Sequence, residues 1–292
     1  MDTQNLKAFQ SVAEFASFSA AADALHLTQS AVSKRIATLE QQLNCRLFDR
    51  IGRTISLTEA GRTLLPRAKR ILREVSDTQR LITDLSGCVR GHLQLATSHH
   101  IGLHHLPALL RKFSQQFPDV TLDLDFLGSE KASDAVLHGH VELAIVTLSP
   151  IWDKHLQYHS IWPDPLQFVA APDHALVQRP TLKFEDLSRY PAILPSLNTY
   201  TTTLIKRLFD ERQLPLYLTM ATDYLETIKM MVSIGLGWSV LPETIIDNQL
   251  TVLNIKGQPA TIRELGCVYH GERSISNAAR AFLQLLLENK KS

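Results

Sequence analysis

Residues 19–43 read SAAADALHLTQSAVSKRIATLEQQL, and this stretch decides the fold of the N-terminal part of the chain. Small residues at 20–24 predict a short helix that begins at a Ser19 cap, and a turn at 26–27 precedes a longer helix capped by Thr28. One apolar stripe in this longer helix predicts its core-facing side: Val32, Ile36, Leu39 and Leu43. Upstream, apolar residues at helical spacing predict another helix over 4–16, capped by Thr3. Together the three helices predict a helix-turn-helix unit.

The opposite face of the helix over 28–43 is small, polar and partly basic. Such a face can enter the major groove of double-stranded DNA without steric or apolar penalty. Two short β-like runs follow at 45–50 and 51–57 around a Gly-Arg turn, and they predict a wing whose arginines reach phosphates and a minor groove. The alternative for the helix is an ordinary solvated surface. The predicted DNA contacts are Ser19, Thr28, Gln29, Ser30, Ser33, Lys34, Arg35, Arg50 and Arg53.

A long helix is predicted from Thr58 to about Ser86, with an apolar seam spaced alternately by four and three residues. The seam residues are Leu64, Ala68, Ile71, Val75, Thr78, Ile82 and Leu85. Such a seam favours pairing with the same helix of a second copy, because a two-fold dimer presents two recognition helices to successive major grooves. The alternative is packing against the helix's own domain.

An ordered set of residues over about 60 positions resembles the signature of the LysR-type family of transcription regulators. It comprises Ala20-Ala21, Thr28-Gln29-Ser30-Ala31-Val32-Ser33, Leu39-Glu40, Leu43, Leu47-Phe48, Arg50 and Leu57-Thr58-Glu59-Ala60-Gly61. The resemblance implies a winged helix-turn-helix with a recognition helix over 28–43, in a cytoplasmic bacterial regulator that assembles as a dimer or tetramer. RNA polymerase is a further candidate partner. Ser30 stands where many relatives have proline, which affects a local contact and not the fold.

The periodicity changes after residue 91 to a βαβαβ pattern, which predicts a parallel sheet. The predicted strands cover 92–96, 120–126, 143–147, 156–162, 166–171, 191–194, 216–220, 237–241, 251–255 and 266–270. The predicted helices cover 106–117, 130–138, 201–212, 224–234 and 275–289. This half resembles the effector-binding domain of the same family, a two-lobed α/β fold similar to periplasmic binding proteins, and the run GLGWSVLP at 235–242 matches its usual pattern.

The domain boundaries follow from these patterns and the resemblance. We expect a winged helix-turn-helix over 1–58, a linker and dimerisation helix over 59–88, and an effector-binding domain over 91–292. The resemblance implies that lobe I takes 91–161 with 267–292, and that lobe II takes 162–266. In open α/β sheets, ligands bind beyond the carboxyl ends of strands, where helix N-termini offer free amides.

Hydroxyl and imidazole donors follow the strands at this predicted cleft and suit a small, anionic metabolite. The predicted effector-binding residues are Thr97, Ser98, His99, His100, Ser129, Thr147, Thr199, Thr201, Thr202 and Asp223. The alternative role for each threonine and serine is ordinary helix capping. The histidine cluster at 99, 100, 104 and 105 has no Cys, Asp or Glu at suitable sequence spacing, so pocket or surface histidines are favoured over a metal site. No metal and no cofactor are therefore predicted.

Composition narrows the remaining functions. Residues 1–90 carry a net charge of +4 and the remainder −3, which suits a nucleic-acid-facing front half. Apolar runs are too short to cross a bilayer and no signal peptide is visible, so a cytoplasmic protein without membrane contact is expected.

Cys88 and Cys267 lie at opposite ends of the effector half, which disfavours a redox pair. The sequence has no nucleophile elbow, no Walker loop and no dinucleotide fingerprint, so an enzyme is disfavoured and no catalytic residues are predicted. An architectural DNA-binding protein that senses nothing stays an alternative.

Overall fold

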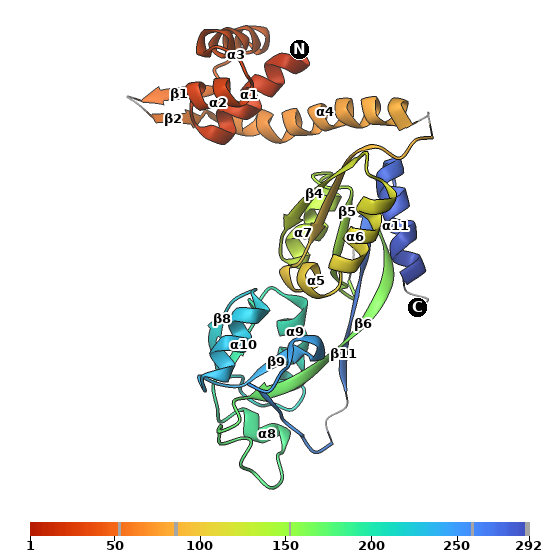
Figure 1. Ribbon diagram of the computed structural model, residues 1–292. Helices are drawn as coiled ribbons and strands as arrows, with labels where there is room; N and C mark the ends of the chain where they lie inside the picture. Colours follow the sequence, from red (N-terminus) through yellow and green to blue (C-terminus); the bar gives the residue numbers. More distant parts are fainter. Residues whose placement is uncertain (52–53, 85–86, 152, 258–259, 290–292) are drawn as a thin grey trace. The chain divides into compact units, whose positions relative to one another are not determined.

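The computed structural model describes residues 1–51, 54–84, 87–151, 153–257 and 260–289. The chain divides into two compact units, residues 1–86 and 87–292, and each is described by itself (Figure 1). None of the helices in these described ranges combines the length and the apolar character that a bilayer-spanning helix requires.

The first unit begins with three helices around one apolar core: α1 (Thr3–Phe15), α2 (Phe18–Ala24) and α3 (Gln29–Leu43). The cap of α3 is confirmed, because the Thr28 side chain accepts from the Ala31 N–H. The two other predicted caps are wrong. Asp2 accepts from the Gln4 N–H at α1, and Ser17 accepts from the Ala20 N–H at α2, so each helix begins one or two residues earlier than predicted. The stripe of α3 also ends sooner, since Leu43 is 37% exposed.

Strands β1 (Phe48–Ile51) and β2 (Thr54–Leu57) pair antiparallel and confirm the wing. The Glu40 carboxylate of α3 accepts from the Leu47 N–H at 2.7 Å and thereby fixes where β1 begins. Thr58 donates to the Arg46 carbonyl at 2.7 Å and accepts from the Gly61 N–H at 3.0 Å. A Cβ at Gly61 would lie 2.2 Å from the Leu47 carbonyl oxygen, so only glycine lets the next helix pass this close. These contacts explain several residues of the family signature.

Helix α4 (Glu59–Asp84) confirms the long helix and contains Pro66. Its first turns contribute Leu64 and Ala68 to the core of the unit. Further along, Val75 is half-buried and Ile82 is 65% exposed. Leu85 lies outside the described residues. The apolar seam therefore leaves the core of its own unit before the helix ends.

The second unit opens with the predicted βαβαβ segment, which we call lobe I together with the C-terminal helix. Strands β3 (Gly91–Thr97), β4 (Val120–Phe126) and β5 (Leu143–Thr147) are parallel in the order β4-β3-β5, which confirms the parallel sheet. The helices of this lobe are α5 (His99–His104), α6 (Pro107–Gln116), α7 (Ser129–Leu137) and α11 (Asn277–Asn289). Helix α5 was not predicted, because it is only six residues long.

Alternating side chains of the lobe I strands feed two apolar layers. Leu95 and Ile145 join the layer formed with α6 and α11, whereas Ala96 and Val146 join the layer formed with α7. Figure 1 shows the helices on the two faces of the sheet. Burial on both faces explains why β5 is almost wholly apolar.

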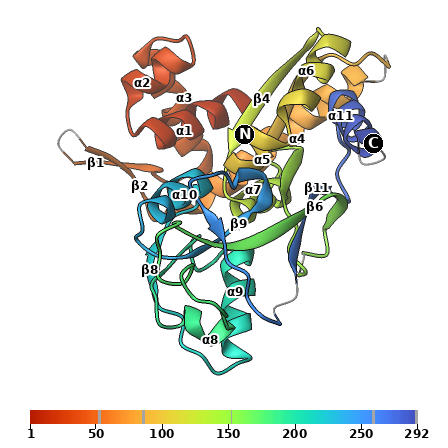
Figure 2. The same cartoon turned by 60° about the horizontal axis from the view of Figure 1, so that its bottom comes forward.

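Lobe II is the remainder of the second unit, and Figure 2 shows its helices and strands together. Its strands are the C-terminal end of β6 (Leu156–Ala170), β7 (Ala192–Leu194), β8 (Leu218–Ala221), β9 (Ser239–Pro242) and β10 (Thr251–Val252). Its helices are α8 (Phe184–Leu187), α9 (Tyr200–Asp210), α10 (Leu225–Ser233) and the single turn η1 (Glu243–Ile245). Trp238 is fully buried, and its Nε1 donates to the Leu187 and Tyr190 carbonyls. A Cβ at Gly237 would lie 2.4 Å from the Pro191 carbonyl oxygen, which accounts for the glycine before this tryptophan.

Two long strands, β6 and β11 (Thr261–His270), connect the lobes and pair antiparallel with each other. Two separate strands were predicted over 156–171 because prolines stand at 163 and 165. Prolines two residues apart turn their nitrogens, which carry no hydrogen, toward the same edge of the strand. The hydrogen bonds between β6 and β11 therefore continue along the other edge. The wider sheet is accordingly mixed and not purely parallel, since β11 runs antiparallel to both β5 and β6.

Candidate functional site

The first candidate site is the exposed face of α3. Its apolar residues Val32 and Ile36 are buried, whereas Gln29, Ser30 and Lys34 are exposed. Helix α3 thus presents a polar, partly basic surface of the kind that reads a major groove.

The other predicted contacts of this unit lie at or near the two ends of that face. The Ser19 hydroxyl of α2 donates to the Gln29 side-chain oxygen at 3.4 Å, and the Thr28 and Ser30 hydroxyls lie 3.0 Å apart. Ser33 is half-buried, and half-buried Arg35 donates to the Gln4 side chain at 3.3 Å. Arg53 lies outside the described residues, and only the backbone of Arg50, in β1, is described.

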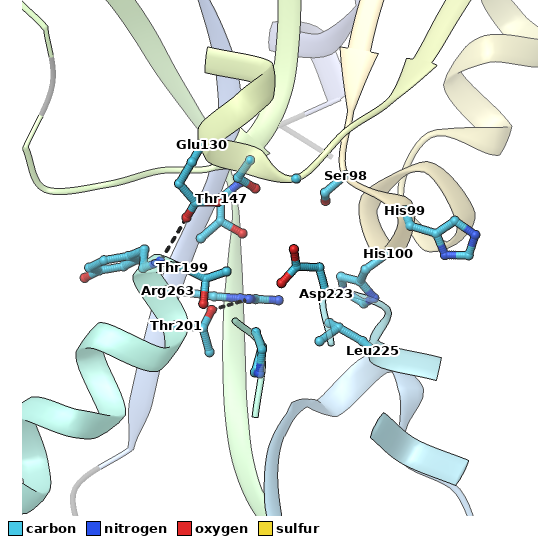
Figure 3. A pocket seen from close by; sticks show the side chains of 14 residues that line it. Ser98, His99, His100, Glu130, Thr147, Thr199, Thr201, Asp223, Leu225 and Arg263 are labelled. Atoms are coloured by element: carbon cyan, nitrogen blue, oxygen red, sulfur yellow. Dashed lines mark hydrogen bonds between the residues drawn. The ribbon is translucent and has the colours of Figure 1, made fainter. Parts of the chain in front are cut away.

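The second candidate site is a cleft between the lobes of the second unit (Figure 3). About 500 Å³ of space is free of atoms there, including the opening to solvent. The cleft is lined by Ser98, His99, His100, Gly128, Ser129, Glu130 and Thr147 from lobe I, by Pro195, Thr199, Tyr200, Thr201, Asp223 and Leu225 from lobe II, and by Arg263 of the connecting strand β11. These residues follow strand ends and begin helices α5, α7, α9 and α10, which is where ligands of such folds bind.

Eight of the ten predicted effector-binding residues line this cleft: Ser98, His99, His100, Ser129, Thr147, Thr199, Thr201 and Asp223. Two predicted residues do not. Thr97 is fully buried and donates to the Ile145 carbonyl at 3.0 Å, and Thr202 is fully buried and donates to the Pro195 carbonyl at 2.7 Å. The Thr97 hydroxyl joins β3 to β5 and the Thr202 hydroxyl holds the segment before α9, and neither residue lines the cleft.

Arg263 is the main cleft residue that the sequence analysis missed. Its side chain is 6% exposed; Nε donates to Asp164 Oδ2 at 2.6 Å and Nη1 donates to Thr201 Oγ1 at 2.7 Å. The Asp164 carboxylate, 1% exposed, lies behind the guanidinium. The one available signal was the position of Arg263 two residues before the buried Leu265, which places both side chains on one face of β11.

Two carboxylates face the same cleft. Glu130 accepts from the Tyr200 N–H at 2.9 Å, so a residue of α7 in lobe I caps the first turn of α9 in lobe II. Asp223 accepts from the Ser196 N–H at 3.0 Å within lobe II. The dashed lines in Figure 3 mark the bond to Glu130 and the bond between Arg263 and Thr201. A ligand of this cleft therefore meets one guanidinium and two acceptor carboxylates.

The cleft hydroxyls fall into two groups. Ser129 accepts from the Thr147 N–H at 3.1 Å, and Thr199 caps α9 by accepting from the Thr202 N–H. Within the described ranges, the hydroxyls of Ser98 and Thr147 make no hydrogen bond. Ser98 stands before α5 without capping it. These two hydroxyls are the ones available to a ligand.

Among the histidines at the edge of the cleft, His100 is buried, and His99 and His104 lie beside the Glu226 carboxylate. Burial, together with the Arg263 charge and the neighbouring imidazoles, lowers the pKa of His100 to about 3. His99 Nδ1 lies 3.4 Å from Glu226 Oε2, and His104 Nε2 lies 3.2 Å from Glu226 Oε1. Although burial opposes it, bonds from the α10 backbone and from both histidines lower the pKa of Glu226. Glu226 was not predicted, because it lies 122 residues from His104.

Comparison with known proteins identifies the family of both units of the chain. Residues 3–62 match the model of the bacterial regulatory helix-turn-helix protein, lysR family, and residues 86–291 match the LysR substrate binding domain. An uncharacterized HTH-type transcriptional regulator in the ibpB-leuC intergenic region of Azotobacter vinelandii is 65% identical over 107 residues, which cover 37% of this chain and 74% of that protein.

Two solved structures share the fold. Full-length CbnR complexed with its target DNA superposes with a TM-score of 0.71 at 21% identity, covering 99% of this chain and 100% of CbnR. The regulatory domain of CcmR from Synechocystis PCC6803, in complex with 2-PG, superposes with a TM-score of 0.62 at 23% identity, covering 70% of this chain and 99% of that domain.

A helix-turn-helix unit joined to a two-lobed domain with a cleft defines a ligand-responsive DNA-binding regulator, which is not an enzyme. The chain belongs to the LysR family of bacterial transcription regulators.

Proposed function

We propose that this regulator reads DNA with the N-terminal part of α3 and senses a small acid in the cleft of its second unit. The observation that most strongly supports the DNA contact is that Gln29, Ser30 and Lys34 are exposed on the side of α3 opposite to its buried stripe. Gln29 and Ser30 meet base edges, while Lys34 and the wing arginines Arg50 and Arg53 neutralise phosphates or enter the minor groove.

Substitution of Gln29 tests this assignment. Gln29→Ala removes a bidentate partner for adenine, so it lowers affinity for the cognate site by about 1–3 kcal/mol and leaves binding to random DNA nearly unchanged. Lys34→Ala serves as the contrast, because loss of a phosphate contact weakens both kinds of binding and reduces the salt dependence. Equal losses for Gln29→Ala on cognate and random DNA would contradict base reading by Gln29.

The observation that most strongly supports the effector site is that the Arg263 guanidinium lies in the cleft and is held there by hydrogen bonds to Asp164 and Thr201. A buried guanidinium favours a carboxylate or phosphate group, which it binds in bidentate geometry. Glu130 and Asp223 accept hydrogen bonds, so the same ligand also carries hydroxyl or amine donors. A small hydroxy acid, amino acid or sugar phosphate has this combination, and the CcmR regulatory domain was solved in complex with 2-PG.

The free hydroxyl of Ser98 provides the test for the effector site. Ser98→Ala removes a donor that stabilises no neighbouring group, so it weakens acid binding by about 0.5–1.5 kcal/mol without lowering the unfolding temperature. Calorimetric titration with a panel of small carboxylates and phosphates measures this loss, and Ser188→Ala, far along the chain in lobe II, is the control. A panel ligand that binds both variants with unchanged affinity would place the site elsewhere.

We further infer how binding reaches DNA. Glu130 with Tyr200, and His104 with Glu226, join the two lobes across the cleft opening. An acid that competes with Glu130 for the N-terminus of α9 changes the preferred closure of the lobes, and a difference in affinity between closures shifts their populations. If a bound acid leaves the DNA footprint and transcription unchanged, this coupling is refuted.

Assembly and location complete the proposal. The last described residue of the α4 seam, Ile82, is exposed, which suits pairing with α4 of a second copy, and the family resemblance favours a dimer or a tetramer. The regulator then acts on chromosomal DNA in the bacterial cytoplasm, with RNA polymerase as a partner. Analytical ultracentrifugation of Ile82→Lys checks the seam, since a charge there shifts the protein toward the monomer.

A further inference from the structure

Four histidines at and just after the short helix α5 meet an acidic residue from the other lobe. His100 and His104 are four residues apart in α5 and therefore project from one face of it. Glu226, in the first turn of α10, reaches that face and lies 3.2 Å from His104 Nε2. The fold therefore brings Glu226 to the histidines, although no Asp or Glu lies at a suitable spacing from them in the sequence.

The geometry of these three side chains suits a small divalent ion. One ring nitrogen each of His100 and His104 and one Glu226 oxygen all lie within 4.8 Å of one another. Zinc bonds of about 2.0–2.2 Å in a tetrahedral arrangement place ligand atoms roughly 3.4 Å apart. The separation of 3.2 Å between His104 Nε2 and Glu226 Oε1 is close to this value, and the ligand nitrogen of His100 lies within 4.8 Å of the other two ligand atoms.

A second observation comes from His100 itself. The residue is 4% exposed, and neither of its ring nitrogens has a hydrogen-bond partner in the described part of the chain. Buried polar atoms without partners cost about 1–3 kcal/mol each, so such a residue requires an explanation. A bound ion would supply a partner for one of these ring nitrogens.

A competing ligand set uses His100 with His105 and Asp164. Asp164 Oδ2 already accepts from Arg263 Nε at 2.6 Å, so an ion bound to the unpartnered Oδ1 would share its only carboxylate with a guanidinium. Among the described residues, no Lys or Arg forms an ion pair with Glu226; its neighbours are the rings of His99 and His104. The arrangement with Glu226 is electrostatically the better of the two.

We propose that His100, His104 and Glu226 form a binding site for a divalent transition-metal ion of the Zn²⁺ type at the edge of the cleft. Two imidazoles and one carboxylate are the ligands of an open zinc site, with a fourth position for water. Since α5 belongs to lobe I and α10 to lobe II, a bound ion fastens the two lobes together. The site needs no acid effector and stands or falls independently of the proposed effector.

The test uses the full-length chain without an affinity tag, and Zn²⁺ or Co²⁺ alone as the probe. Calorimetry measures affinity and stoichiometry, and the absorption spectrum of bound Co²⁺ reports its geometry. The ligand variants are His104→Ala and Glu226→Gln. His138→Ala is the matched control, because His138 also lies beside a carboxylate, with its Nδ1 3.7 Å from Asp134, on a separate exposed surface. Circular dichroism verifies that each variant is folded.

The proposal predicts one equivalent of Zn²⁺ per chain, a tetrahedral Co²⁺ spectrum, and an affinity loss of at least 10-fold in both ligand variants. Even residues that only support a metal ligand cost about 10–100-fold when they are replaced. His138→Ala should bind as the unmodified chain does. No saturable binding, or binding that His104→Ala and Glu226→Gln leave unchanged, overturns the site. Loss in His105→Ala with retention in Glu226→Gln overturns this ligand set in favour of the competing one.

Discussion

Breaking the buried ion pair of Arg263 and Asp164 by removing one partner should cost far more stability than breaking an exposed pair of the same length. Their Nε–Oδ2 distance is 2.6 Å with side chains 6% and 1% exposed, whereas Lys206 and Asp210 are also 2.6 Å apart but more than half exposed. Asp164→Ala leaves the guanidinium with Thr201 as its one remaining polar partner in the described chain. Removal of one partner of a buried pair costs about 3–5 kcal/mol, against about 0.3–0.5 kcal/mol for an exposed helical pair.

Urea unfolding followed by tryptophan fluorescence measures this difference. All three tryptophans, at 152, 162 and 238, lie in the second unit, so the signal follows the unit that contains the pair. Asp210→Ala is the control for Asp164→Ala. A double variant, Asp164→Leu with Arg263→Met, should recover most of the lost stability while losing acid binding, because apolar residues can replace a buried pair. If Asp164→Ala costs no more than Asp210→Ala, burial of this pair has been misjudged.

Three further predictions concern other parts of the chain. Gly61→Ala should destabilise the first unit by about 1–3 kcal/mol and weaken DNA binding, because its Cβ would lie 2.2 Å from the Leu47 carbonyl oxygen; calorimetric unfolding of the variant checks this. A thiol reagent should modify exposed Cys88 in the native protein but Cys267 only after unfolding, since burial raises the pKa of the Cys267 thiol, and peptide mapping distinguishes the two. Burial, partly offset by the charge of Asp173, lowers the pKa of His174 below 6.5, and the ring Nδ1 accepts a hydrogen bond from the Leu176 N–H. The neutral ring therefore contributes stability that is fully present above pH 6.5 and is lost as the pH falls toward the folded-state pKa. A proton NMR titration of His174 with a midpoint at or above 6.5 would be contrary to this prediction.

Local patterns predicted most of the helices and strands of this fold, although not α5 or an uninterrupted β6. The stripe of Val32, Ile36 and Leu39 predicted α3, alternation predicted β4 with its observed bounds, and β5 was predicted over 143–147 as observed. Capping was less predictable, because Ser17 and Ser19 are both acceptable caps and the packing of Phe18 decides between them. A residue that fits two local roles needs tertiary information.

The cleft shows the same limit more clearly. Hydroxyl residues directly after strands, such as Ser98 and Thr147, were predictable because the fold class fixes where strand ends meet. Arg263 and Glu226 were not, since each reaches the site from a distant segment and through a pairing that the sequence does not specify. The predicted absence of a metal site rested on that missing carboxylate, and this is the premise that the structure corrects.

The pairing of β6 with β11 restricts the motion by which the lobes can respond. Their register shifts at Leu265 and Gly266, opposite Trp162 and Ser160, so an irregularity stands midway along the only two strands that join the lobes in the described chain. A hydrogen-bonded ribbon resists sliding, whereas a bulge allows it to bend and twist. The closure proposed above is therefore expected to be a torsion about this one ribbon, whose stiffness would set how far the lobes rotate. A side chain at Gly266, where a Cβ would lie 2.2 Å from the His159 carbonyl oxygen, would disrupt the pairing of β6 with β11 and so alter how the two lobes can move.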